Sequence, residues 1–196
     1  MAATAPRRER AHGGVSAGAD APPARVELRL LGTPRILVGD RWRPLPADRR
    51  GQLLAFLALD GEWVARDRIA DLLWPDLTMA AARRNLRHLV HTIARRAPVP
   101  GLEVAREALR WSVDSDVARV RAALSSAALE DAVASYTGPL LEGFEARAAG
   151  AFGAWLEVER EALRRRHRDA VVELVRREAS SARPERATAF AMRIVD

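Results

Sequence analysis

Residues 79–96 read MAAARRNLRHLVHTIARR, with five arginines, two histidines and no acidic residue, although the whole chain has 26 Asp and Glu. Apolar residues recur here at the spacing of an amphipathic helix packed on a core, namely Ala82, Leu86, Leu89, Val90, Ile93 and Ala97. At about 100° per residue, the opposite face carries Arg84, Arg87, His88, His91 and Arg95. No acid lies one turn away to pair with them, so the pattern favours a nucleic-acid-facing helix over a solvated face.

This helix is the third in a predicted series. Alternating residues predict strands near 26–31, 35–38 and 41–45. A period of 3.6 then predicts a helix that Asp48 caps and that stops near Gly61, and a second that Pro75 ends. The expected N-cap of the third helix is Asp76 or Thr78.

A second alternating stretch follows the third helix. LEVAREALRWSVD, residues 102–114, predicts a hairpin whose apolar residues point to one side, namely Leu102, Val104, Leu109, Trp111 and Val113. The predicted order of elements, a small sheet followed by three helices and a hairpin, is that of a winged helix-turn-helix. In that motif the third helix enters the major groove and the hairpin touches the backbone or the minor groove.

From residue 116 onward the periodicity predicts helices only. We expect two short helices in 116–136, a loop at 137–144, one long or two abutting helices over 151–180, and another from 184. An apolar stripe that runs to the last residue is typical of helical repeats, which bury their faces on neighbours. The predicted fold class is α+β and then all-α: a disordered tail at 1–24, a winged-helix domain at 25–114 and a helical domain at 115–196, which we expect to be incomplete.

Composition narrows the function classes. The net charge of +6 favours a polyanionic partner. All 32 basic residues are arginine, so the choice of arginine over lysine is no evidence for bidentate phosphate recognition. There is no cysteine, no bilayer-length apolar run and no signal peptide, which predicts a cytoplasmic protein without membrane contact. We find no catalytic constellation and no phosphate loop, and His88 and His91 lack further metal ligands, so neither an enzyme nor a cofactor is expected.

Several motifs together resemble the SARP type of bacterial transcriptional activator: RRGQLLAFLAL, RDRIADLLWPD, AAARRNLRHLVHTIARR, YTGPLLEGF and WLEVEREALRRR. The resemblance implies an OmpR/PhoB-like winged helix followed by a bacterial transcriptional activation domain of tetratricopeptide-like helices. Two positions depart from the family pattern. Ala65 stands where a Ser or Thr cap is common, and the REAL turn at 106–109 lacks a glycine.

The helix face and this resemblance together assign roles. We expect base edges to be read by Arg84, Arg87, His88 and His91, phosphates to be held by Arg83 and Arg95, and the hairpin to contact DNA through Arg106 and Arg110. The resemblance implies that the turn before the third helix faces RNA polymerase, at its sigma factor, through Asp76 and Leu77, and the helices after residue 116 are the second candidate surface for this contact. It also implies two copies, a homodimer on DNA, bound head to tail on direct repeats about 10–10.5 bp apart.

Three alternatives accompany these assignments. The chain could be a helical-repeat adaptor whose basic N-terminal domain binds an acidic protein, although such a helix would normally expose apolar anchors. The run LRRRHR at 163–168 could bind a second polyanion, although upstream glutamates can pair with it. Trp63, Trp74 and Trp111 are expected to pack between elements rather than to stack on bases.

Overall fold

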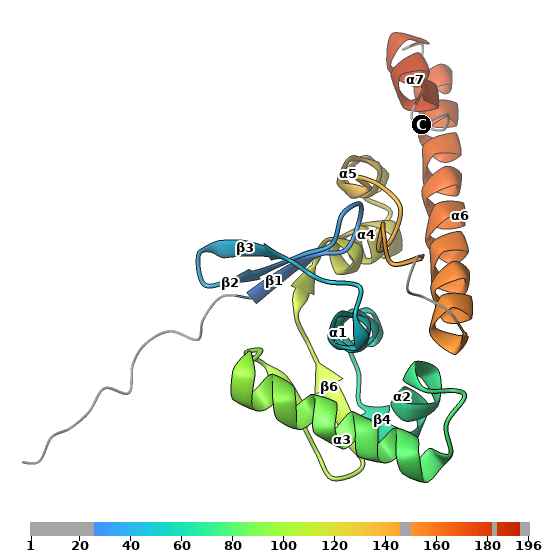
Figure 1. The fold of residues 1–196 in the computed structure, drawn as a ribbon. Helices are drawn as coiled ribbons and strands as arrows, with labels where there is room; N and C mark the ends of the chain where they lie inside the picture. The colour runs from blue at the N-terminus through green and yellow to red at the C-terminus, as the bar shows by residue number, and fades with distance from the viewer. Residues whose placement is uncertain (1–25, 146–149, 182–183, 193–196) are drawn as a thin grey trace, which may run out of the picture.

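The computed structural model describes residues 26–145, 150–181 and 184–192, so the predicted tail at 1–24 lies outside the described residues. The fold is mixed α/β (Figure 1). In chain order the elements are β1 (Val26–Arg29), β2 (Arg35–Val38), β3 (Arg41–Pro44), α1 (Arg49–Asp60), β4 (Val64–Ala65), α2 (Arg66–Leu73), α3 (Met79–Arg96), β5 (Leu102–Val104), β6 (Ala108–Trp111), β7 (Asp114–Ser115), α4 (Asp116–Ser125), α5 (Leu129–Ser135), α6 (Ala151–Ser180) and α7 (Pro184–Ala191).

The strands form two small sheets. The first has the order β3-β2-β1-β7, with antiparallel pairs throughout except that β7 runs parallel to β1. The second has the order β4-β6-β5 and is antiparallel. The predicted strands and hairpin are confirmed, whereas β4 and β7, each two residues long, were not predicted. These two strands tie segments that are far apart in the chain.

Helix α1 is the centre of the core. Every residue from 51 to 59 is buried, and the Asp48 side chain accepts a hydrogen bond from the Gly51 amide (2.9 Å), as predicted. Gly51 is required because a Cβ there would lie 1.8 Å from the Pro46 carbonyl oxygen. At the other end Gly61 adopts φ +75° and donates its amide to Leu57, which is a left-handed helix stop.

The predicted core stripe of α3 is confirmed. Its buried residues are Ala82, Leu86, Val90 and Ile93, with Leu89 partly buried beside them. Of the two candidate caps, Thr78 is the N-cap: its side chain accepts from the Ala81 amide at 3.4 Å. Asp76 does not cap the helix.

The hairpin is only partly buried. Leu109 and Trp111 on β6 are fully buried, and the Trp111 indole donates to the Pro100 carbonyl (3.0 Å). Val104 shares the face of its register partner Leu109, as predicted, but is 51% exposed, and Trp63, which was expected to pack between elements, is 45% exposed.

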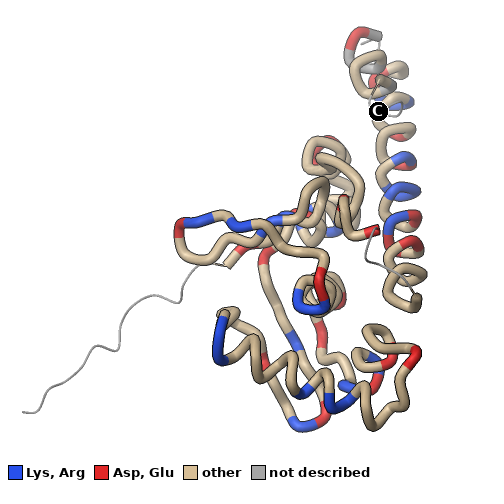
Figure 2. Tube along the Cα trace, in the orientation of Figure 1, with Lys and Arg blue, Asp and Glu red and all other residues tan. Residues whose placement is uncertain are grey.

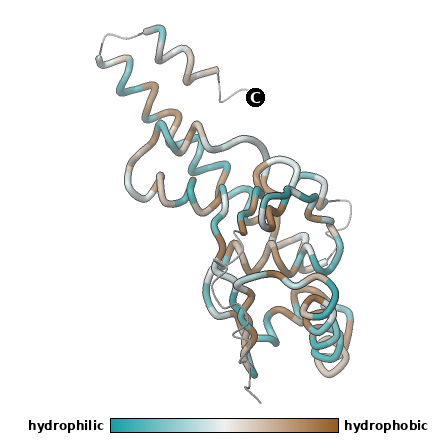
Figure 3. The backbone as a smooth tube through the Cα atoms, turned by 90° about the vertical axis from the view of Figure 1, so that its left-hand side faces the viewer, coloured by the Kyte–Doolittle hydropathy of each residue, from teal (hydrophilic) through white to brown (hydrophobic). Residues whose placement is uncertain are grey.

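The segment after β7 is helical, as predicted, and residues 151–180 form one long helix rather than two. Hydrophilic and hydrophobic segments alternate along the α6–α7 pair (Figure 3). One buried apolar cluster runs from Leu28 on β1, through α1, α2 and α3, to Phe152 and Leu163 on α6. The core is therefore continuous across residues 114–115, where the sequence predicts a domain boundary.

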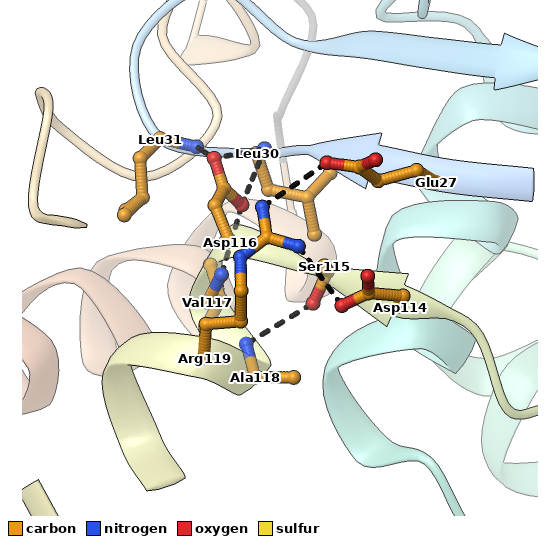
Figure 4. A network of polar contacts seen from close by, with 9 residues as sticks. All are labelled: Glu27, Leu30, Leu31, Asp114, Ser115, Asp116, Val117, Ala118 and Arg119. Atoms are coloured by element: carbon orange, nitrogen blue, oxygen red, sulfur yellow. Dashed lines mark hydrogen bonds and ion pairs between the residues drawn. The ribbon is translucent and has the colours of Figure 1, made fainter. Parts of the chain in front are cut away.

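A buried carboxylate joins the first sheet to α4 (Figure 4). Asp116 accepts hydrogen bonds from the amides of Leu30 (2.9 Å), Leu31 (3.0 Å) and Val117 (2.8 Å). Burial raises the pKa of Asp116, while the three amides and nearby Arg119 act in the opposite direction. Next to it, the Ser115 hydroxyl caps α4 by accepting from the Ala118 amide (3.1 Å).

No helix in the described ranges is both long and apolar enough to cross a membrane.

Asp116→Asn should destabilise the protein by about 1–3 kcal/mol at pH 7, because the amide group places a donor against the buried N–H groups of Leu30 and Leu31. Urea unfolding measures the difference. The control is Asp114→Asn, which alters an exposed side chain that pairs with Arg119 and should cost less than about 1 kcal/mol. Equal losses in the two variants would contradict the role given to Asp116.

Candidate nucleic-acid interface

The exposed face of α3 is a narrow band of basic side chains. Arg84, Arg87, His88, His91 and Arg95 are all exposed. At 100° per residue they lie within about 100° of one another around the helix. None of the five forms an ion pair with a residue that the structure describes. Basic positions recur along α3 and in the β5–β6 turn beside it, at the end of the molecule away from α7 (Figure 2).

Arg83 differs from these five, because it is already paired. Its guanidinium makes a two-pronged contact with the carboxylate of Asp67 on α2, and both side chains are about half exposed. The hydrogen bond from Arg83 lowers the pKa of Asp67, so the pair stays ionised at neutral pH. This carboxylate was missed by sequence reasoning, which compared only residues one turn apart on the same helix.

The β5–β6 turn presents Arg106 to solvent. Its side chain is 95% exposed and its contact with Glu107 (3.1 Å) joins two exposed groups, which restrains it little. The turn is closed by a hydrogen bond from the Ala105 amide to the Ala108 carbonyl (3.0 Å). No residue in this turn has a positive φ, which is why the REAL sequence needs no glycine.

Arg66 holds the turn in place beside α2. Its guanidinium donates to the Ala105 carbonyl from Nε (3.2 Å) and Nη2 (3.0 Å), and its own amide donates to the Glu107 carbonyl (2.9 Å). The last bond occupies the first amide of α2, whose N-cap residue Ala65 has no side-chain acceptor. No local pattern in the sequence identifies this contact between residues about forty positions apart.

Arg110 is less available than Arg106. It pairs with Glu103 across the hairpin (2.8 Å) and lies over the Trp63 ring, 5.0 Å from its centroid. Its side chain is 33% exposed. The exposed tryptophan thus has a cationic partner on β6, and the predicted contact of Arg110 with DNA would compete with two contacts inside the protein.

The turn between α2 and α3 is exposed. Asp76 is solvent-accessible, and Leu77 is 44% exposed while its amide donates to the Trp74 carbonyl (3.2 Å). Because Thr78 caps α3, the carboxylate of Asp76 has no structural task at the helix end. The neighbouring Pro75 lies against the start of α6, since a Cβ on Gly150 would be 3.3 Å from its Cγ.

The basic run at 163–168 on α6 is only partly paired, because Arg165, Arg166 and Arg168 form no ion pair with a residue that the structure describes. Arg164 pairs with Glu161 (3.5 Å), and His167 stacks on Tyr136 with ring centroids 4.2 Å apart. The described residues contain no group of three or more histidines or acids that could hold a metal ion.

No protein-family profile matches the chain, and no curated protein sequence matches it significantly. Its structure is similar to that described as "Mycobacterium tuberculosis EmbR in complex with low affinity phosphopeptide", with a TM-score of 0.61 and 21% sequence identity. The alignment covers 85% of this chain and 48% of the EmbR chain, so the chain spans about half of the length of that protein. At this identity the likeness shows that the chain shares the mixed α/β fold of the matched part of EmbR.

Proposed function

We propose that this protein is a sequence-specific, double-stranded DNA-binding transcriptional activator, with residues 25–114 acting as a winged helix. The observation that carries the proposal is the band of five exposed basic residues on α3 without an acidic partner among the described residues. The order of α1, β4, α2, α3 and the β5–β6 hairpin is that of a winged helix, whose third helix occupies the major groove. The fold shared with EmbR and the resemblance to SARP activators support the same function.

Within this band, Arg84, Arg87, His88 and His91 read base edges. Arginine bonds guanine in a bidentate way, and histidine supplies either a donor or an acceptor. Arg95 and Arg106 hold phosphates on either side, because the former lies near the end of α3 and the latter on the exposed turn. Arg83 and Arg110 contact DNA only when they give up Asp67 and Glu103.

A helical adaptor that binds an acidic protein is the competing function. It would need apolar anchors on the exposed face of α3. Among the described residues, the exposed large apolar side chains include Met79 at the first position of α3 and none further along the helix. This distribution favours DNA.

We also infer that two copies bind direct repeats about one helical turn apart, since a single small module buries limited surface on DNA. Activation would come from the sigma factor of RNA polymerase binding the exposed turn through Asp76 and Leu77. An acid beside an apolar side chain suits a basic protein surface, and the cap at Thr78 leaves Asp76 free for this task.

Arg84→Ala or Arg87→Ala should each weaken binding to duplexes selected from a random library by about 1–3 kcal/mol and relax the preference at one base pair. Arg106→Ala should weaken all sequences alike and reduce the salt slope by about one. Fluorescence anisotropy over a salt series measures both quantities. The matched control is Arg176→Ala, an exposed arginine of α6 outside the 163–168 run, which should change neither. If the α3 variants behave like this control, the proposed docking is wrong.

Asp67→Asn should strengthen binding to non-specific duplex DNA and steepen the salt slope by about one, because Arg83 becomes available to a phosphate. Asp71→Asn removes the same charge from α2 without releasing Arg83, so its slope should stay close to that of the wild type. Identical slopes for the two variants would show that Asp67 acts only through its charge.

Asp76→Asn should keep DNA affinity and lower transcription several-fold in a purified system with bacterial RNA polymerase. The reason is that the substitution removes a charge that neither caps α3 nor belongs to its basic face. Asp40→Asn, in the exposed β2–β3 turn, is the control for charge alone. Undiminished transcription from the Asp76 variant would remove this residue from the polymerase contact.

A further inference from the structure

A pocket lies on the far side of β1 and β2 from the proposed DNA-binding helix, where the β1–β2 turn meets α4, the end of α5 and the loop that follows. Its volume is about 620 Å³. That size suits a small metabolite. Its cationic and hydroxyl groups are Arg29, Arg35, Arg119, Thr33, Ser135 and Thr137.

The two arginines on the strands are a like-charged pair. Arg29 and Arg35 sit directly opposite each other in the β1–β2 register, an arrangement that costs stability unless an anion lies between them. Neither forms an ion pair with a carboxylate among the described residues, and Arg29 instead lies over the Trp42 ring, 4.5 Å from its centroid. Two uncompensated guanidinium groups lining one pocket are suited to an oxyanion.

The acidic groups of the pocket are already engaged. Asp116 accepts three backbone amides, and Glu142 accepts a hydrogen bond from the Thr33 hydroxyl (3.2 Å). Arg119 is neutralised by Glu27 (3.2 Å) and Asp114 (2.9 Å). The binding capacity that remains is therefore cationic and comes from the two strand arginines.

The walls of the pocket are fixed by backbone contacts. The Gly32 amide donates to the Pro139 carbonyl (2.9 Å), and the Leu141 amide donates to the Leu30 carbonyl (2.7 Å). A Cβ on Gly138 would lie 3.1 Å from the Cα of Gly32, so the β1–β2 turn and the loop after α5 touch directly. A ligand would meet a site whose shape is set in advance, which lowers the entropy lost on binding.

We propose that this pocket binds a small metabolite through its phosphate group, held between Arg29 and Arg35 with the Ser135 hydroxyl as a further donor. A phosphate offers more acceptor oxygens than a carboxylate and so matches two guanidinium groups and a hydroxyl at once. The bound molecule bridges the first sheet and the α4–α5 region. This site is independent of the proposed DNA interface, because α3 contributes no residue to it.

The test is a phosphorus NMR titration of the full chain with inorganic phosphate and with glucose 6-phosphate, at constant ionic strength. Both probes should bind the wild type, and Arg35→Gln should weaken binding at least tenfold. The same substitution should leave the unliganded protein as stable as before or more stable, because it removes a like-charge repulsion. If Arg35 had only a structural role, Arg35→Gln would instead destabilise the unliganded protein.

Two controls separate this site from other basic surfaces. Arg43→Gln removes an exposed arginine of the same sheet that does not line the pocket and should keep phosphate binding, as should the Arg84→Ala variant of α3. Equal weakening by Arg35→Gln and Arg43→Gln, or no binding of either probe, would overturn the proposal. So would binding of a hexaglutamate peptide that depends on Arg35 while both phosphates fail to bind, since the occupant would then be an acidic protein segment.

Discussion

The carboxylate of Asp116 is the constraint on which the arrangement of the two halves depends. It binds amides at the end of β1 that precede it by 86 and 85 residues, and it does so from the first turn of α4. Because β7 pairs with β1 immediately before this residue, no free linker separates the sheet from the helices. A buried carboxylate is tolerated here because every described amide that faces it donates to it. The continuous core from β1 to α6 follows from this attachment.

Local patterns predicted the elements that have a period, and the structure confirms them. The buried apolar faces of α1 and α3, the N-cap at Asp48 and the helix stop at Gly61 are all determined by residues close together in the sequence. Strands β4 and β7 were missed because two residues carry no alternation and depend on partners elsewhere in the chain. The 45% exposure of Trp63 could not be predicted for a related reason, because the partner of its ring, Arg110, lies on another element.

The candidate interface was predictable in its centre and less so at its edges. The band on α3 follows from helical geometry alone, and its exposure agrees with that prediction. The partners Asp67, Glu103 and Arg66 could not be found by comparing residues one turn apart, because each lies on another element. These contacts separate the basic residues that have a partner inside the protein from those that do not. The separation depends on the tertiary structure and cannot be predicted from local sequence.

Helix α6 is long enough to connect two distant parts of the molecule. At 1.5 Å per residue, its thirty residues extend for about 45 Å, and its first turn rests against Pro75 in the turn that leads into α3. A tilt of about 5° at that contact moves the distant end of α6 by roughly 4 Å. One continuous helix therefore connects the α5–α7 end of the molecule to the segment that precedes the basic helix.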